Sequence, residues 1–206
     1  MTQVEVSNTA LSYLGIRAKI VAADEDSVEA KACLTHWAGL RDLSLRLHDW
    51  SFARVTVRLE GAAAPSEATP ATPWRYRHAL PADCLSLRRL NGRAVGEPDE
   101  VCEIAAERED DGAIAAILYS DFDPADATYT ARVSDVVRWD AGFADAMAWG
   151  LAARVCYELT ARDDRARTLT QQWQVALALA AATAANEPSG RPTMALPEAI
   201  RVRGWR

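Results

Sequence analysis

The side chains of this chain that could act as nucleophiles, general bases or metal ligands are few: three histidines and four cysteines. None of the histidines has a second histidine or a carboxylate at the spacing of an HExxH zinc motif. The cysteines show no CxxC spacing, and each has apolar neighbours, which favours buried, reduced thiols over disulfides or metal ligands. The residues concerned are His36, His48, His78, Cys33, Cys84, Cys102 and Cys156. We therefore expect no metal and no cofactor.

One enzymatic arrangement remains open, a small intracellular hydrolase that uses Cys84, Asp83 or a histidine. It requires a histidine and a carboxylate within hydrogen-bonding distance of the Cys84 thiol. The chain contains no GxGxxG or Walker phosphate-binding loop and no GxSxG nucleophile motif. Asp121 and Asp123 have the DxD spacing of some metal sites, but Pro124 beside them is typical of a turn. We expect a protein that is not an enzyme, with the hydrolase as the alternative.

The acidic residues are unevenly distributed along the chain. Its net charge is −6, yet residues 97–126 are strongly acidic and hold a single basic residue, Arg108. Four of these acids are predicted to lie at one hairpin tip: Glu107, Glu109, Asp110 and Asp111. Such a tip is either a solvated turn or a surface that repels a passing polyanion or docks on an arginine-rich neighbour. Arginines that could complement it come earlier in the chain, at Arg75, Arg77, Arg88, Arg89 and Arg93.

The C-terminal segment, residues 188–206, has the opposite charge. Its arginines outnumber its one acidic residue, Glu198, and apolar side chains are interleaved with them. Arginine and tryptophan are frequent at interface hot spots. We expect the segment to bind a partner through Arg191, Ile200, Arg201, Arg203, Trp205 and Arg206. The alternatives are a frayed terminus and a contact with nucleic acid.

The hydrophobic pattern predicts helices at both ends of the chain and strands between them. Apolar residues with helical spacing begin after Thr2, after Asp26 with Glu29 as a capping box, after Asp140 and after Asp163. Six short apolar or alternating runs predict strands, within residues 53–59, 74–80, 85–90, 101–106, 113–120 and 127–133. The fold class is therefore α+β. Residues 1–50 and 135–187 form a helical body, and residues 51–134, with a linker at 60–73, form a small antiparallel β insertion.

Composition excludes several classes of function. Hydrophobic residues make up 50% of the chain and charged residues 25%, which is typical of a folded globular protein. No apolar run is long enough for a membrane helix, and the N-terminus lacks a secretion signal, so we expect a soluble protein with no membrane partner. A pI near 5.1 argues against a DNA-binding accessory protein, whose affinity would depend steeply on salt.

Several short blocks follow one another between residues 8 and 85. They are residues 8–15, 24–27, the pair Arg41-Asp42 with Leu45, and residues 50–53, 74–77 and 80–85. In their order and spacing these blocks resemble the head-to-tail adaptor proteins of tailed phages, the tail tubular protein A and tail accessory factor group. The predicted helical hairpin after Asp135 agrees with that group in layout only. The linker at 60–73 and the acidic segment at 97–126 depart from it.

The resemblance implies a structural protein of the virion, made in the host cytoplasm and located in the phage neck or tail. Members of the group form a ring of twelve copies between the portal and the tail tube or nozzle, and genomic DNA passes through the ring without specific binding. Their helices meet the portal, their β part faces the tail, and the C-terminal segment engages the portal. We expect the same partners for this chain: itself, a portal protein and a tail tube or nozzle protein.

Overall fold

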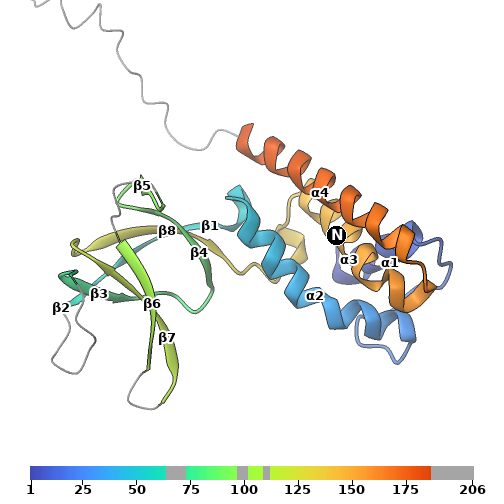
Figure 1. Cartoon of the computed structure of the whole chain (residues 1–206), viewed down its shortest axis with the longest axis horizontal. Coiled ribbons are helices and arrows are strands. Elements are labelled where there is room, and N and C mark those ends of the chain that lie inside the picture. The colour runs from blue at the N-terminus through green and yellow to red at the C-terminus, as the bar shows by residue number, and fades with distance from the viewer. Residues whose placement is uncertain (64–72, 97–101, 109–111, 187–206) are drawn as a thin grey trace, which may run out of the picture.

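The computed structural model describes residues 1–63, 73–96, 102–108 and 112–186. The described chain has two parts at opposite ends of an elongated molecule (Figure 1). The helical body contains α1 (Gln3–Tyr13), α2 (Val28–Leu47), α3 (Ala141–Thr160) and α4 (Asp163–Asn186). The β part contains the strands β1 to β8, which lie between α2 and α3 in the sequence. The α+β class is confirmed.

The helices begin where local side chains satisfy their first N–H groups. Thr2 caps α1 in a capping box with Glu5, and the side chain of Asp140 accepts the N–H groups of Gly142 and Phe143 at the start of α3. The predicted box of Asp26 and Glu29 is wrong. Ser27 is the N-cap of α2 instead, because its hydroxyl accepts from Ala30 N at 3.2 Å.

α3 is the central helix of the body, and α1, α2 and α4 all pack against it. Most of its side chains between Phe143 and Cys156 are buried. α3 and α4 form the predicted hairpin, with only residues 161 and 162 between them, and Ala161 adopts a left-handed conformation at φ 52°. The connection is therefore shorter than the four residues that the sequence predicted.

The strands form two four-stranded antiparallel sheets, which is more β structure than the small insertion predicted from the sequence. The first sheet has the order β1-β8-β4-β5, and the second has the order β2-β3-β7-β6. The strand bounds are β1 Arg54–Leu59, β2 Ala62–Ala63, β3 Tyr76–Ala79, β4 Cys84–Leu90, β5 Arg93–Ala94, β6 Cys102–Arg108, β7 Ile114–Ser120 and β8 Ala125–Ala131. The prediction missed the two-residue strands β2 and β5, which are too short to produce an alternating pattern.

The chain passes from one sheet to the other four times, and two of these connections, between β1 and β2 and between β7 and β8, contact each other. Gly61 N, in the first connection, donates to the Asp123 carboxylate in the second at 3.0 Å. His78 is buried beside them, and its Nε2 donates to the carbonyl of Phe122 at 2.9 Å. A side chain at position 61 would meet the His78 ring, since a Cβ there would lie 2.7 Å from Cε1. The Asp121–Asp123 motif thus belongs to a turn, as the sequence indicated.

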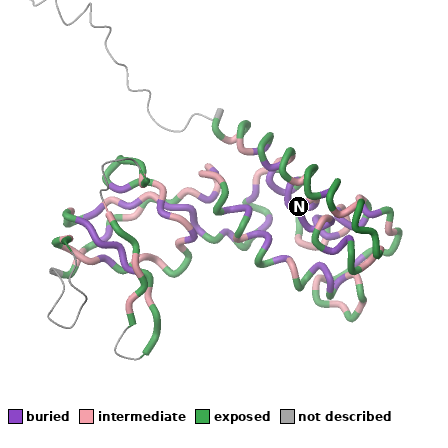
Figure 2. Tube along the Cα trace, viewed as in Figure 1, coloured by how far each residue is buried: buried purple, intermediate pink, exposed green. Residues whose placement is uncertain are grey.

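Each part has its own hydrophobic core, and buried positions run through both (Figure 2). The core of the helical body includes Trp50, whose ring packs edge-on against Phe143 with centroids 4.9 Å apart. The core of the β part lies between the sheets around Leu90, Leu118 and Tyr129. The two cores meet at β4, where Leu85 belongs to the helical core and Leu87 to the β core.

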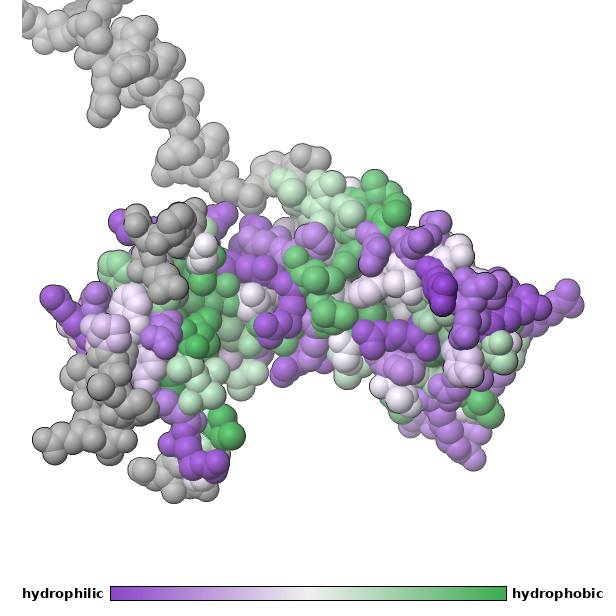
Figure 3. Space-filling view, in the orientation of Figure 1, coloured by the Kyte–Doolittle hydropathy of each residue, from purple (hydrophilic) through white to green (hydrophobic). Residues whose placement is uncertain are grey.

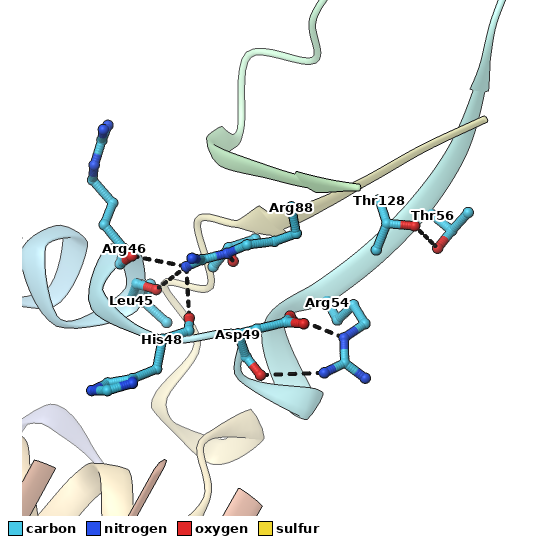
Figure 4. Close-up of polar contacts among 9 residues, drawn as sticks. Leu45, Arg46, His48, Asp49, Arg54, Thr56, Arg88 and Thr128 are labelled. Carbon is cyan, nitrogen blue, oxygen red and sulfur yellow. Dashed lines mark hydrogen bonds and ion pairs between the residues drawn. The ribbon is translucent and has the colours of Figure 1, made fainter. Parts of the chain in front are cut away.

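An arginine of β4 joins the two parts (Figure 4). The Arg88 guanidinium donates to the main-chain carbonyls of Leu45, Arg46 and His48, at 3.4, 2.8 and 2.7 Å, and to the Thr130 hydroxyl at 2.8 Å. Leu45 and Arg46 lie in the last turn of α2 and His48 is its C-cap, so no helical N–H is available to these carbonyls. The positive charge also opposes the negative end of the helix dipole. Arg88 therefore fixes the end of α2 against the first sheet.

A second polar cluster strengthens this junction. Asp42 on α2 accepts from Arg41 at 2.8 Å and from Arg132, just after β8, at 3.0 Å, and Arg41 also donates to Ser134 at 3.1 Å. The sequence pattern had placed Arg41 and Asp42 on the solvent face of the helix. That expectation is wrong for Arg41, which is buried, and Asp42 is half-buried, because the chain leaving β8 passes over this side of α2.

We expect Arg88→Ala to lower the free energy of unfolding by about 2 to 3 kcal/mol, since several carbonyls would lose a charged donor. Denaturant unfolding measures this loss. The neighbouring exposed arginine provides the control: Arg89→Ala should change stability by less than about 0.5 kcal/mol. Equal effects of the two substitutions would mean that Arg88 does not hold the junction.

Two mid-helix glycines should respond in opposite ways to alanine. A Cβ at Gly150 would lie 2.9 Å from the Trp173 ring and 3.0 Å from Leu40, whereas one at Gly39 would meet nothing within 4 Å. Gly150→Ala should therefore destabilise the chain by about 1 to 3 kcal/mol through overpacking. Gly39→Ala should stabilise it by up to about 1 kcal/mol through helix propensity. Thermal unfolding of both variants tests the packing of α3, and a stabilised Gly150→Ala variant would contradict it.

Candidate functional site

Most of the residues predicted to bind partners lie outside the described part of the chain. This is so for Arg191, Ile200, Arg201, Arg203, Trp205 and Arg206 in the C-terminal segment, and for Glu109, Asp110 and Asp111 at the acidic tip. Those interfaces therefore stay predictions. Glu107 is the one predicted interface residue that the structure describes.

Glu107 is engaged within its own sheet. It lies on β6 and accepts from Arg77 on β3 at 2.6 Å, so the two side chains meet across β7, which separates their strands. The Glu107 side chain is only 13% exposed. Its charge is therefore neutralised inside the molecule and adds little to a charged tip. The sequence had grouped Glu107 with the tip because it could not show which arginine the fold brings to it.

The other arginines that precede the acidic segment separate into two groups. Arg88 is part of the junction, whereas Arg75, Arg89 and Arg93 are exposed. Arg89 and Arg93 lie on β4 and β5, at one edge of the first sheet. A positive edge of the β part is thus available to an acidic partner.

The described residues do not bring a base to Cys84. Its pKa is raised, first by burial and then by the neighbouring charge of Asp83, so the thiol is protonated at neutral pH. Asp83 accepts from the Tyr129 hydroxyl at 3.1 Å. Two of the histidine rings make other contacts. His78 hydrogen-bonds the carbonyl of Phe122, and His48 packs edge-on against Trp50 with centroids 5.5 Å apart. This geometry offers no support for a cysteine nucleophile.

The described residues contain no group of three or more His, Cys, Asp and Glu side chains placed to hold a metal ion. Within these described ranges, no helix is both long and apolar enough to cross a membrane.

A shallow groove of about 320 Å³ lies between α3 and α4. It is lined by Gly142, Asp145, Trp149, Gln172, Val175, Ala176, Leu179, Ala180 and Thr183. Hydrophobic surface gathers over the C-terminal half of α4 beside it (Figure 3). Val175 and Leu179 are 53% and 65% exposed and lie one helical turn apart, so together they form an apolar patch beside the groove.

The groove exists because the two helices approach closely with small residues. A Cβ on Gly142 would lie 3.1 Å from the Cβ of Ala180, so no side chain rises from this part of the floor. The small side chains of the alanine-rich α4 allow another backbone to approach it closely. The structure shows that α3 of the same chain makes the close approach on one face of α4.

The α3 side of the groove is formed by the Trp149 ring and the Asp145 carboxylate, next to Gly142. Trp149 stacks on Tyr13 of α1, with centroids 3.8 Å apart, and the Tyr13 hydroxyl donates to Asp145 at 2.6 Å. Burial and the Asp145 carboxylate raise the pKa of Tyr13 above its usual value. Among the described residues, Asp145 has no cationic partner. It is the one charged residue of the lining.

Sequence reasoning missed Asp145 and Trp149 as groove residues, because it assigned α3 only to the core. One signal was present in the sequence. From Thr168 to Asn186 the chain has no charged residue, although one face of this helix meets solvent. Solvent-exposed helices usually carry charges on that face, so an uncharged one indicates a contact surface.

Comparison with models of protein families and with curated proteins found no match to this chain.

We expect Cys84 to react with iodoacetamide at pH 7.4 at least about tenfold more slowly than free cysteine, because burial and Asp83 both disfavour the thiolate. Peptide mass spectrometry of the timed reaction measures the rate. Cys33, whose pKa burial raises to about 11, is the internal reference for an unreactive thiol. Faster labelling of Cys84 than of free cysteine would restore the hydrolase alternative.

Proposed function

We propose that this protein is a structural subunit of a phage virion, an adaptor that joins the portal to the tail tube or nozzle. Copies of the chain, twelve on the pattern of the adaptor group, form a ring through which genomic DNA passes. The helical body faces the portal and the β part faces the tail.

The observation that carries this proposal is the two-ended shape with a fixed junction (Figure 1). An adaptor must contact one ring with one end and another ring with the opposite end, and it must hold the two contacts at a constant angle. Arg88, Arg132 and Asp42 tie the helical body to the β part with charged hydrogen bonds, which are stronger than neutral ones.

The blocks that resemble the adaptor group contribute to this shape. Asn8 exchanges two hydrogen bonds with the main chain of Ile20, at 2.8 and 2.9 Å, and so fixes the loop before α2. Glu25 accepts from Val21 N and Ser27 Oγ at 2.8 and 2.6 Å, and these contacts lower its pKa. Each block thus supplies a contact that a shared fold would need to keep.

Residues 41–53, which include the blocks Arg41-Asp42 with Leu45 and residues 50–53, end α2 and turn the chain into β1. Trp50 is fully buried there, and its Nε1 donates to the carbonyl of Ser44 at 3.0 Å. Asp49 accepts from Arg54 at 3.0 Å, at the start of β1. These contacts support the proposal because they sit where the adaptor needs its two ends joined.

The experiment that tests the proposal is the mass of the complex formed when this chain is mixed with the portal ring from the same genome. We expect about one copy of the chain for each portal subunit, measured by native mass spectrometry. The same assay tests the C-terminal segment: removing residues 188–206 should weaken binding at least about tenfold, because many weak contacts act together in a ring.

Replacing Arg201, Arg203 and Trp205 with alanine should reproduce that loss. The matched control replaces Thr193 and Met194, which lie in the same segment but carry neither charge nor an aromatic ring. Failure of the intact chain to associate with the portal at any concentration would overturn the proposed function.

A further inference from the structure

We propose that the α3–α4 groove binds the C-terminal segment of the same chain, with the apolar side chains of that segment placed in the groove. This inference goes beyond the proposed function and does not rest on it, because it concerns a contact within one chain. Three observations lead to it: the apolar match, the charge of Asp145 and the point at which the described chain ends.

The groove and the segment match in apolar character. The groove offers Val175, Leu179 and the ring of Trp149 around a floor of small residues. In the segment, Ile200 and Val202 alternate with Arg201 and Arg203. An extended chain places alternate side chains on opposite sides. Ile200 and Val202 would thus enter the groove together while the two arginines point outward.

Their charges are also complementary. Asp145 is the one charged residue of the groove lining, and among the described residues it has the Tyr13 hydroxyl as its partner but no cation. The segment has four arginines and one acidic residue, Glu198. Arg206 lies on the same side of an extended segment as Ile200 and Val202, so it is the arginine that would reach this carboxylate. An arginine pairs favourably with a carboxylate beside an apolar surface, since its planar group is only weakly hydrated. No lining residue has a positive charge to oppose this contact.

The segment begins at the groove. α4 ends at Asn186, shortly after Thr183 of the lining, and the chain continues to Arg206. Leu179 lies about 10 Å back along the helix axis at the usual rise per residue. An extended chain spans about 3.3 Å per residue, so only a few of the residues after Asn186 are needed to return to Leu179. The return requires a turn, and the segment has residue types that are frequent in turns at Pro188, Gly190 and Pro192. Because the segment is tethered to α4, its effective concentration at the groove is about a millimolar, which is well above the concentration of a second copy in dilute solution.

Limited trypsin digestion of the full chain tests the inference. Trypsin cuts after arginine, but Arg191 is followed by proline and resists, so the informative sites are Arg201-Val202 and Arg203-Gly204. Groove binding slows both cuts. We expect Leu179→Glu to speed them about tenfold, which follows from a millimolar local concentration and a dissociation constant of about 0.1 mM. Mass spectrometry of the released C-terminal peptides gives the initial rates.

The matched control is Leu34→Glu, which makes the same change on α2 at a leucine that is 50% exposed. Leu34→Glu should leave the cutting rates unchanged. Asp145→Asn, which keeps an oxygen to accept from Tyr13 but removes the charge, should speed the cuts about twofold to threefold. Circular dichroism of each variant confirms that its helices are intact.

Equal rates for the natural chain and Leu179→Glu would overturn the inference. So would protection that grows with protein concentration, because a second copy would then occupy the groove. These rates are measured without portal protein. If the segment is protected but the chain does not bind the portal, only the proposed function is contradicted. If the chain binds the portal but the segment is not protected, only groove binding is contradicted.

Discussion

The arrangement of this molecule depends on Arg88 and on the irregular strand that carries it. β4 pairs with β8 through two register shifts, between Cys84 and Ser86 and between Leu87 and Arg89, so Leu85 and Arg88 are the extra residues. Such bulges redirect side chains. Leu85 consequently enters the helical core, and Arg88 reaches the carbonyl groups at the end of α2. Burial lowers the pKa of Arg88, yet an arginine stays charged at neutral pH.

The elements were predictable where their signals are local, and their contacts were not. The caps at Thr2 and Asp140 and the alternation before Leu59 depend on neighbours in sequence, and the structure confirms these elements. The bulge at Arg88 and the solvent exclusion of Arg41 depend on strands and segments that are distant in sequence. The helical pattern shows on which face of the helix a residue lies, but it does not show whether a distant segment of the chain packs over that face.

The same limit explains the charges of the β part. In the sequence, the acidic segment and the arginines before it form two separate groups, which favours contacts between molecules. In the structure, Arg77 and Glu107 meet across β7, and Arg58 pairs with Asp126 between β1 and β8. Some of the acidic residues and arginines that are separate in the sequence therefore form ion pairs within the chain. The exposed arginines at positions 75, 89 and 93 are what remains for a partner.

The groove follows from how tightly α3 and α4 are packed. Gly142 and Ala180 approach closely, and the small side chains around this contact leave Val175 and Leu179 exposed beside it. An uncharged helix face of this kind favours association unless something covers it. A covering segment from the same chain removes that exposure in every copy and needs no partner. In the proposed docking, Arg201 and Arg203 would be directed outward along the helical body, which is the end of the molecule that the proposed adaptor turns to the portal.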